Sequence, residues 1–199
     1  MNPAYKDASR PEEERVTDLL GRMTLEEKFT QMRMIVQIDK LLKEQPFSKV
    51  AVEKPLEHGI GATYSASCID PKVLNAFQKY LMEDTRLGIP LIMMGESLHG
   101  VMSTDATVFP QSIGLGASWN VPLIHDIVDV IGREARILGI TQTYAPNLDL
   151  SREPRWGRVE ENYGEDPYLT SRIGVEYVKT LQSHGVAASP KHYVAHGSP

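Results

Sequence analysis

The chain has 199 residues, of which 41% are hydrophobic and 24% charged, a composition typical of a globular protein with one sizeable core. Its net charge of −5 is mild, which disfavours nucleic acid and anionic membranes as partners. No apolar run approaches the roughly 18 residues of a membrane span, and no signal-peptide core follows Met1. We therefore expect no membrane contact and a cytoplasmic location. Cys68 is the single cysteine, which excludes an internal disulfide and a thiolate metal cluster.

Helix patterns recur along the chain. Residues 11–23 carry apolar side chains such as Val16 and Leu20 at helical spacing, which predicts a helix with one apolar face. A capping box at Thr24 predicts the start of a second short helix. Three further helices are expected: one opening at Asp70-Pro71 with Val73, Leu74, Phe77 and Leu81 directed inward, one over about 121–138, and one from Asp166-Pro167 to 181.

Strand patterns alternate with these helices, at residues 59–64, 90–94, 141–144 and 185–189. The run at 90–94 is continuously apolar, as in strands buried on both faces of a parallel sheet. Alternating strands and amphipathic helices indicate parallel βαβ units. Either a β/α barrel or an open doubly wound sheet fits, and the absence of a glycine-rich phosphate fingerprint favours the barrel. A complete barrel needs roughly 250 residues, so we expect an incomplete barrel that forms a single partial domain over residues 1–199.

Polar clusters follow three of the predicted strands. Glu96 comes just after the strand at 90–94, a loop rich in arginine and acid follows the strand at 141–144, and Lys191-His192 follows the strand at 185–189. The carboxyl ends of the strands carry the active site in a β/α barrel, so these clusters are the candidate functional residues.

Five motifs in this order resemble the N-terminal barrel domain of glycoside hydrolase family 3, the β-glucosidase and β-xylosidase group. They are TLEEK at 24–28, GESLHG at 95–100, TVFPQSIGLGASWN at 107–120, PRWGR at 154–158 with GEDP at 164–167, and KHY at 191–193. The resemblance covers nearly the whole chain from about Val16. The β-N-acetylglucosaminidase branch normally continues Lys-His with Pro-Gly-His-Gly, whereas this chain reads YVAHGSP at 193–199, which favours the glucosidase or xylosidase branch.

The resemblance implies that the substrate-binding residues are Glu96, Arg158, Lys191 and His192. A carboxylate at Glu96 accepts hydrogen bonds from sugar hydroxyls, although many family members have Asp there and a solvated loop acid is the alternative. The guanidinium of Arg158 offers a fixed fork of donors that orients a polyol. Lys191 and His192 match the family pair that contacts hydroxyls at the floor of the subsite.

Other residues near these motifs are interpreted as structural. We expect Arg155 and Glu161 to be charge partners, Trp156 to pack beneath its loop rather than stack on a sugar, and His99 to support its loop by a hydrogen bond. His192 and His196 are four residues apart, but the strand before them argues against a helical zinc site, and no metal is expected. Asp149 is interpreted as a loop-bracing acid, and Glu165 as part of a helix start.

The resemblance implies retaining hydrolysis of terminal β-D-glucosyl or related residues, with two carboxylates about 5–5.5 Å apart and no cofactor. No residue of this chain matches the family's nucleophile or acid/base, which we expect, with the rest of the barrel and a C-terminal domain, outside this sequence. The expected partner is a gluco- or xylo-configured β-glycoside. The chain is then the substrate-binding portion of the enzyme, inactive by itself. A non-catalytic sugar-binding or interaction module is the alternative, which would require a stable fold despite exposed edge strands. The oligomeric state is left open by the sequence, with self-association through exposed barrel edges as one option.

Overall fold

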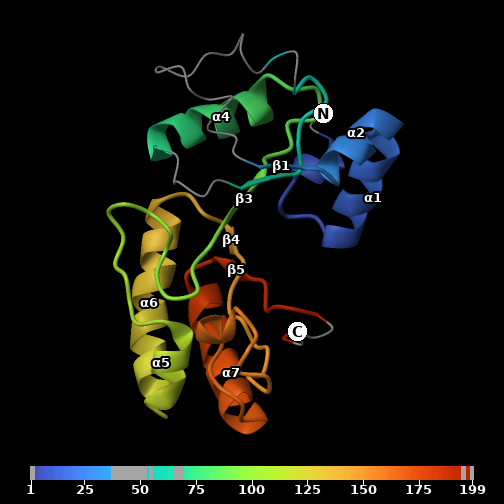
Figure 1. Ribbon diagram of the computed structural model, residues 1–199. Helices are drawn as coiled ribbons and strands as arrows, with labels where there is room; N and C mark the ends of the chain where they lie inside the picture. Colours follow the sequence, from blue (N-terminus) through green and yellow to red (C-terminus); the bar gives the residue numbers. More distant parts are fainter. Residues whose placement is uncertain (1–2, 37–52, 54–55, 65–69, 194–195, 198–199) are drawn as a thin grey trace.

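A five-stranded parallel sheet organises the fold in the order β1-β2-β3-β4-β5 (Figure 1). The structure is a computed structural model and describes residues 3–36, 53, 56–64, 70–193, 196 and 197, so the Cys68 prediction lies outside the described residues. The strands are β1 (Met34–Val36), β2 (Ala62–Tyr64), β3 (Ile92–Gly95), β4 (Gln142–Thr143) and β5 (Ala187–Ala188). Because the order in the sheet follows the order in the chain, each strand pairs with the next one after a crossover, as in a β/α barrel that has not closed.

Two helices precede β1, and the helices from α4 onward lie in the crossovers between later strands and cover one face of the sheet. The helices are α1 (Glu12–Arg22), α2 (Leu25–Gln31), α4 (Pro71–Glu83), α5 (Ser112–Ala117), α6 (Val121–Ile137) and α7 (Pro167–Ser183), with short 3-10 turns η1 (Ala4–Lys6) and η3 (Val159–Glu161). In Figure 1, α6 and α7 run side by side. No helix in the described part of the chain is long and apolar enough to cross a membrane.

The three long helices begin in the same way. The side chains of Asp70, Asn120 and Asp166 each accept a hydrogen bond from a backbone N–H in the first turn of α4, α6 and α7. Each helix also has a proline at its first or second position, where the missing N–H costs nothing. Local sequence alone therefore fixes where these helices start, which confirms both predicted Asp-Pro openings. The capping box between Thr24 and Glu27 is also formed, at 2.9 and 3.2 Å.

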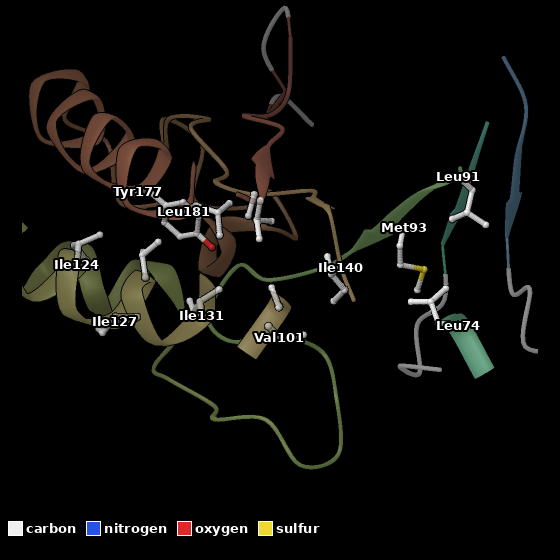
Figure 2. Close-up of a cluster of buried hydrophobic side chains, with 14 of the residues drawn as sticks. Leu74, Leu91, Met93, Val101, Ile124, Ile127, Ile131, Ile140, Tyr177 and Leu181 are labelled. Carbon is white, nitrogen blue, oxygen red and sulfur yellow. The ribbon is translucent and has the colours of Figure 1, made fainter. Parts of the chain in front are cut away.

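One continuous hydrophobic core lies between the sheet and these helices. Figure 2 shows Leu74 of α4, Met93 of β3, Ile131 of α6 and Tyr177 of α7 among its side chains. The four inward residues predicted for α4 are all buried. The sheet contributes every second residue, so that Thr63, Met93 and Thr143 are directed at the helices and are buried.

The opposite face of the sheet, which we call the open face, is formed by alternate residues of the strands. Its members include Met34, Val36, Tyr64, Ile92, Met94 and Gln142. Val36 is 56% exposed and Ile92 is 46% exposed. The prediction that the strand at 90–94 is buried on both faces was therefore wrong, because in the described residues only the helix-covered face is packed.

Two elements were not predicted from the sequence, strand β1 and helix α5. Helix α5 contains two glycines, which disfavour helix. Gly116 of α5 is required by packing, since a Cβ there would stand 2.1 Å from the carbonyl oxygen of Tyr163. Helix α1 forms as predicted, but it buries none of its residues, so its apolar face is not part of the core.

Truncating a core aromatic side chain should destabilise the fold strongly. Phe77 is fully buried in the core, so Phe77→Ala should lower the free energy of unfolding by about 3–5 kcal/mol, through lost burial and the cavity left behind. Phe29 on α2 is 58% exposed, and the matched Phe29→Ala change should cost about 1 kcal/mol or less. Urea unfolding measures both. Equal losses for the two variants would contradict this core assignment.

Candidate functional site

The candidate site lies where β3, β4 and β5 end. Glu96 follows β3, the long loop with Arg158 and Glu161 follows β4, and Lys191 follows β5 by three residues. A cavity of about 220 Å³ opens between these segments. Its wall is formed by Glu96, Leu98, His99, Gly100, Met102, Arg158, Glu161 and Lys191. Residues up to 95 positions apart in the chain thus share one concave surface.

Glu96 and Lys191 form an ion pair across the cavity. The Lys191 ammonium lies 3.4 Å from one Glu96 carboxylate oxygen and 3.5 Å from the other, longer than the usual 2.7–2.9 Å of a charge-assisted hydrogen bond. Both side chains are largely buried, at 26% and 15% exposure. Burial raises the pKa of Glu96; the Lys191 charge partly offsets this, and the Glu161 charge adds to it. The pair is therefore loose, and both groups keep hydrogen-bonding capacity for a ligand.

Arg158 and Glu161 form a much tighter pair on the same wall. Nε and one terminal nitrogen of Arg158 each donate to Glu161 at 2.6 Å, the bidentate geometry favoured by a guanidinium and a carboxylate. Glu161 is the last residue of the turn η3, and Arg158 directly precedes this turn. The turn therefore brings the two side chains, three residues apart in the chain, to the same side of the loop. The hydrogen bonds with Arg158 hold the pKa of Glu161 below its ordinary value. One edge of the guanidinium is thus fixed by the protein.

Asp149 and His192 form a third polar contact beside the cavity. Nδ1 of His192 lies 2.6 Å from one carboxylate oxygen of Asp149. The other carboxylate oxygen accepts the backbone N–H groups of His192 and His196, at 3.3 and 3.0 Å. Burial alone would raise the pKa of Asp149, but these hydrogen bonds outweigh it and lower the pKa. Asp149 therefore braces the loop after β5, as the sequence predicted.

Backbone hydrogen bonds hold the loops around the cavity. The N–H of Leu148 donates to the carbonyl of Lys191, and the N–H of Lys191 donates to the carbonyl of Pro146, which extends the pairing of β4 and β5 into the site. On the other side, Nδ1 of His99 lies 3.0 Å from the carbonyl of Phe109, which confirms the predicted supporting role of His99. His99 also lines the cavity.

Two tyrosines of the open face lie near Glu96. The rings of Tyr64 and Tyr144 are 5.8 Å apart. Burial raises the pKa of both hydroxyls, and the Glu96 charge raises them further. Sequence reasoning did not identify either residue, although Tyr144 ends a predicted strand and Tyr64 another.

The structure brings three of the four predicted site residues together around the cavity, namely Glu96, Arg158 and Lys191. His192 is adjacent to Lys191, but its ring is directed at Asp149 and is not part of the cavity wall. The sequence missed the contribution of Glu161 to this wall, where it pairs with Arg158. The spacing of three residues between opposite charges was the available signal.

The residues interpreted as structural have mixed outcomes, because Glu161 pairs with Arg158 on the cavity wall and not with Arg155. Arg155 is highly exposed and pairs with Glu153 in a bidentate contact outside the cavity. Trp156 is 8% exposed and its ring lies 5.2 Å from the ring of His196. In the described residues, no group of three metal-ligating side chains could hold an ion. With two carboxylates and two cations, the cavity wall is suited to a neutral ligand with many hydroxyl groups.

The pKa values of the two glutamates of the cavity should be shifted in opposite directions. Carboxyl carbon shifts followed by NMR should show Glu96 titrating above the ordinary value of 4.5 and Glu161 below it. Since the raised pKa of Glu96 favours its protonated form, its stabilising contribution is complete below pH 4.5 and is lost as pH rises through its folded pKa. For Glu161 the contribution is present above pH 4.5 and is lost as pH falls through its folded pKa.

The variant Glu96→Gln serves to assign the signals, because it should remove only the higher midpoint. A Glu96 midpoint at or below 4.5 would show that solvent or Lys191 outweighs burial, contrary to the site described here.

Comparison with known proteins gives a consistent result. The model of the glycosyl hydrolase family 3 N-terminal domain matches residues 24–199. A putative beta-xylosidase of Formosa agariphila is 34% identical over 219 residues, covering 97% of this chain and 28% of the relative. A periplasmic beta-glucosidase of Salmonella typhimurium is 36% identical over 205 residues, covering all of this chain and 24% of the relative. The chain thus spans about a quarter of the length of these relatives.

Solved structures agree in fold. A beta-glucosidase from Erythrobacter marinus superimposes with a TM-score of 0.83 at 29% identity, covering 96% of this chain and 27% of that one. A beta-glucosidase from Listeria innocua gives a TM-score of 0.75 at 31% identity, covering 92% and 27%. The unclosed parallel sheet described above is therefore part of a β/α barrel, and the chain belongs to glycosyl hydrolase family 3, whose N-terminal domain it matches from residue 24 onward.

Proposed function

We propose that this chain is the sugar-binding portion of a retaining, exo-acting β-glycosidase that acts on terminal β-D-glucosyl or xylosyl residues. The carrying observation is the convergence of Glu96, Arg158 and Lys191 on one cavity at the ends of three strands. These are the positions at which the family resemblance implies contacts to the terminal sugar.

The size and chemistry of the cavity support a single sugar ring as the ligand. Its volume of about 220 Å³ is below the roughly 300–1,000 Å³ of pockets that enclose drug-sized molecules. Glu96 supplies acceptors for hydroxyl protons, while Lys191 and Arg158 supply donors for hydroxyl oxygens. The loose geometry of Glu96 and Lys191 allows a hydroxyl to join both groups, because neither is saturated by the other.

The names of the relatives support the same class of substrate. They are beta-glucosidases and beta-xylosidases, and solved structures of the Listeria innocua beta-glucosidase include complexes with glucose and, for a mutant, laminaribiose. One relative is named as periplasmic, so the cytoplasmic location expected from the sequence remains a prediction.

Hydrolysis would need two catalytic carboxylates, and three acids of the described loops are poorly suited to that role. Asp149 accepts three hydrogen bonds from His192 and His196 and cannot act as a nucleophile without breaking them. Glu161 is held by Arg158, and Glu165 is an exposed residue just before α7. We therefore propose that the nucleophile and the acid/base lie outside this sequence, and that these 199 residues bind the sugar without cleaving it.

Sugar binding at the cavity can be tested by NMR. Methyl β-D-glucoside or methyl β-D-xyloside should shift the signals of Glu96, Arg158 and Lys191. Glu96→Gln keeps the shape of the side chain but removes its charge, and it should weaken binding about 10-fold, or roughly 1.4 kcal/mol. Unchanged signals at the cavity would refute sugar binding. Turnover of an aryl β-glucoside by the 199-residue chain would show that it holds its own catalytic carboxylates.

Glu161 should matter for sugar binding because it fixes one edge of the Arg158 guanidinium. We expect Glu161→Gln to weaken binding of the same glycosides by about 10-fold, since the fork of Arg158 is no longer held. Glu153 makes the same bidentate contact with Arg155 on the exposed surface. Glu153→Gln is therefore a matched control and should leave the affinity unchanged. Equal effects in both variants would mean that the Arg158 pair is merely structural.

A further inference from the structure

His192 and His196 lie side by side but have different hydrogen-bond partners. Their ring centroids are 5.0 Å apart, and the ring of His196 also contacts Trp156. Nδ1 of His192 faces a carboxylate oxygen of Asp149, whereas Nδ1 of His196 accepts the backbone N–H of Gly197 at 2.9 Å. The first partner is an acceptor and the second is a donor. In their neutral forms, the two rings therefore carry their protons on different nitrogens.

The carboxylate of Asp149 decides the tautomer of His192. The side chain of Asp149 is 2% exposed, and an ionised carboxylate can only accept hydrogen bonds. The contact at 2.6 Å therefore requires a proton on Nδ1 of His192. In a neutral imidazole the other nitrogen then carries a lone pair. Among the described residues, Nε2 of His192 makes no hydrogen bond, and the side chain is 28% exposed, so this lone pair is open to a ligand.

We propose that Asp149 is a positioning residue that fixes His192, the residue after Lys191 and beside the cavity wall, as a hydrogen-bond acceptor at Nε2. This inference rests on the proposed function, and it deepens it by naming the ligand chemistry of the pair. Lys191 donates to the oxygen of one sugar hydroxyl, and His192 accepts the proton of a neighbouring hydroxyl. The pair therefore selects a neutral ligand with two adjacent hydroxyl groups.

The tautomers can be read directly by ¹⁵N NMR, because protonated and unprotonated ring nitrogens resonate in separate ranges. The chain, expressed at the length that its gene encodes, should show His192 protonated on Nδ1 alone at neutral pH. His196 should show the opposite pattern and is the internal control. His192→Asn assigns the signals. A His192 ring protonated on Nε2, or on both nitrogens, would overturn the proposal without any sugar being present.

Substitution of Asp149 tests the positioning role. Asp149→Asn keeps the shape but removes the charge, so His192 should lose its single tautomer and glycoside affinity should fall about 10-fold, the scale known for carboxylate partners of metal-bound histidines. The control is Asp129→Asn, because Asp129 pairs with His184 outside the cavity, at 2.8 Å. It should change neither the His192 signals nor the affinity. If Asp149→Asn fails to fold, the wild-type ¹⁵N measurement still decides the tautomer.

A sugar titration separates this inference from the proposed function. Binding of methyl β-D-glucoside should shift the Nε2 signal of His192 together with the signals of Lys191 and Glu96. Shifts at Lys191 and Glu96 with an unchanged His192 would overturn the acceptor contact and leave the proposed function intact. A titration without shifts at any of these residues would refute sugar binding itself, and with it the contact, whatever the tautomer.

Discussion

The register of β3, β4 and β5 is the constraint on which the candidate site depends. Gly95, Thr143 and Ala188 lie directly beside one another across these strands. Because parallel strands leave the sheet at the same edge, the segments that follow them emerge at the same level. Backbone hydrogen bonds from Lys191 to Pro146 and from Leu148 to Lys191 extend this register beyond the last strand. A displacement of β5 by one residue would reverse the directions of all its side chains.

The two ion pairs of the cavity differ in a way that suits different tasks. The pair of Arg158 and Glu161 is close and bidentate, so it fixes the direction of a planar donor group. The pair of Glu96 and Lys191 is longer and largely buried, which leaves both charges incompletely satisfied. Incompletely satisfied buried charges cost free energy in the empty protein. A polyhydroxyl ligand can form hydrogen bonds with both groups. Part of the free energy that is unfavourable in the empty protein then favours binding.

Much of this architecture is predictable because its signals are local. Asp70 and Asp166 each precede a proline and mark helix starts, and Glu96 follows a strongly apolar strand. The missed parts depend on contacts that are distant in the chain. Ile92 is exposed because nothing in the described part of the chain packs on its face of the sheet, and the local sequence does not contain this information. The pairing of His192 with Asp149 joins residues 43 positions apart, so only the assembled loops reveal that the proton of Nδ1 is already engaged.

The contact of Gly116 with Tyr163 links a helix outside the cavity to the cavity wall. The backbone of residue 163 lies against α5 with no room for a Cβ, and Glu161 is only two residues away in η3. Any side chain at position 116 must push this segment outward, and Glu161 would move with it. In a survey of random variants, position 116 would therefore resemble a ligand-binding position in its intolerance, although it touches no ligand. Positions that are sensitive to substitution would then include residues that hold the cavity wall in place as well as residues that line the cavity.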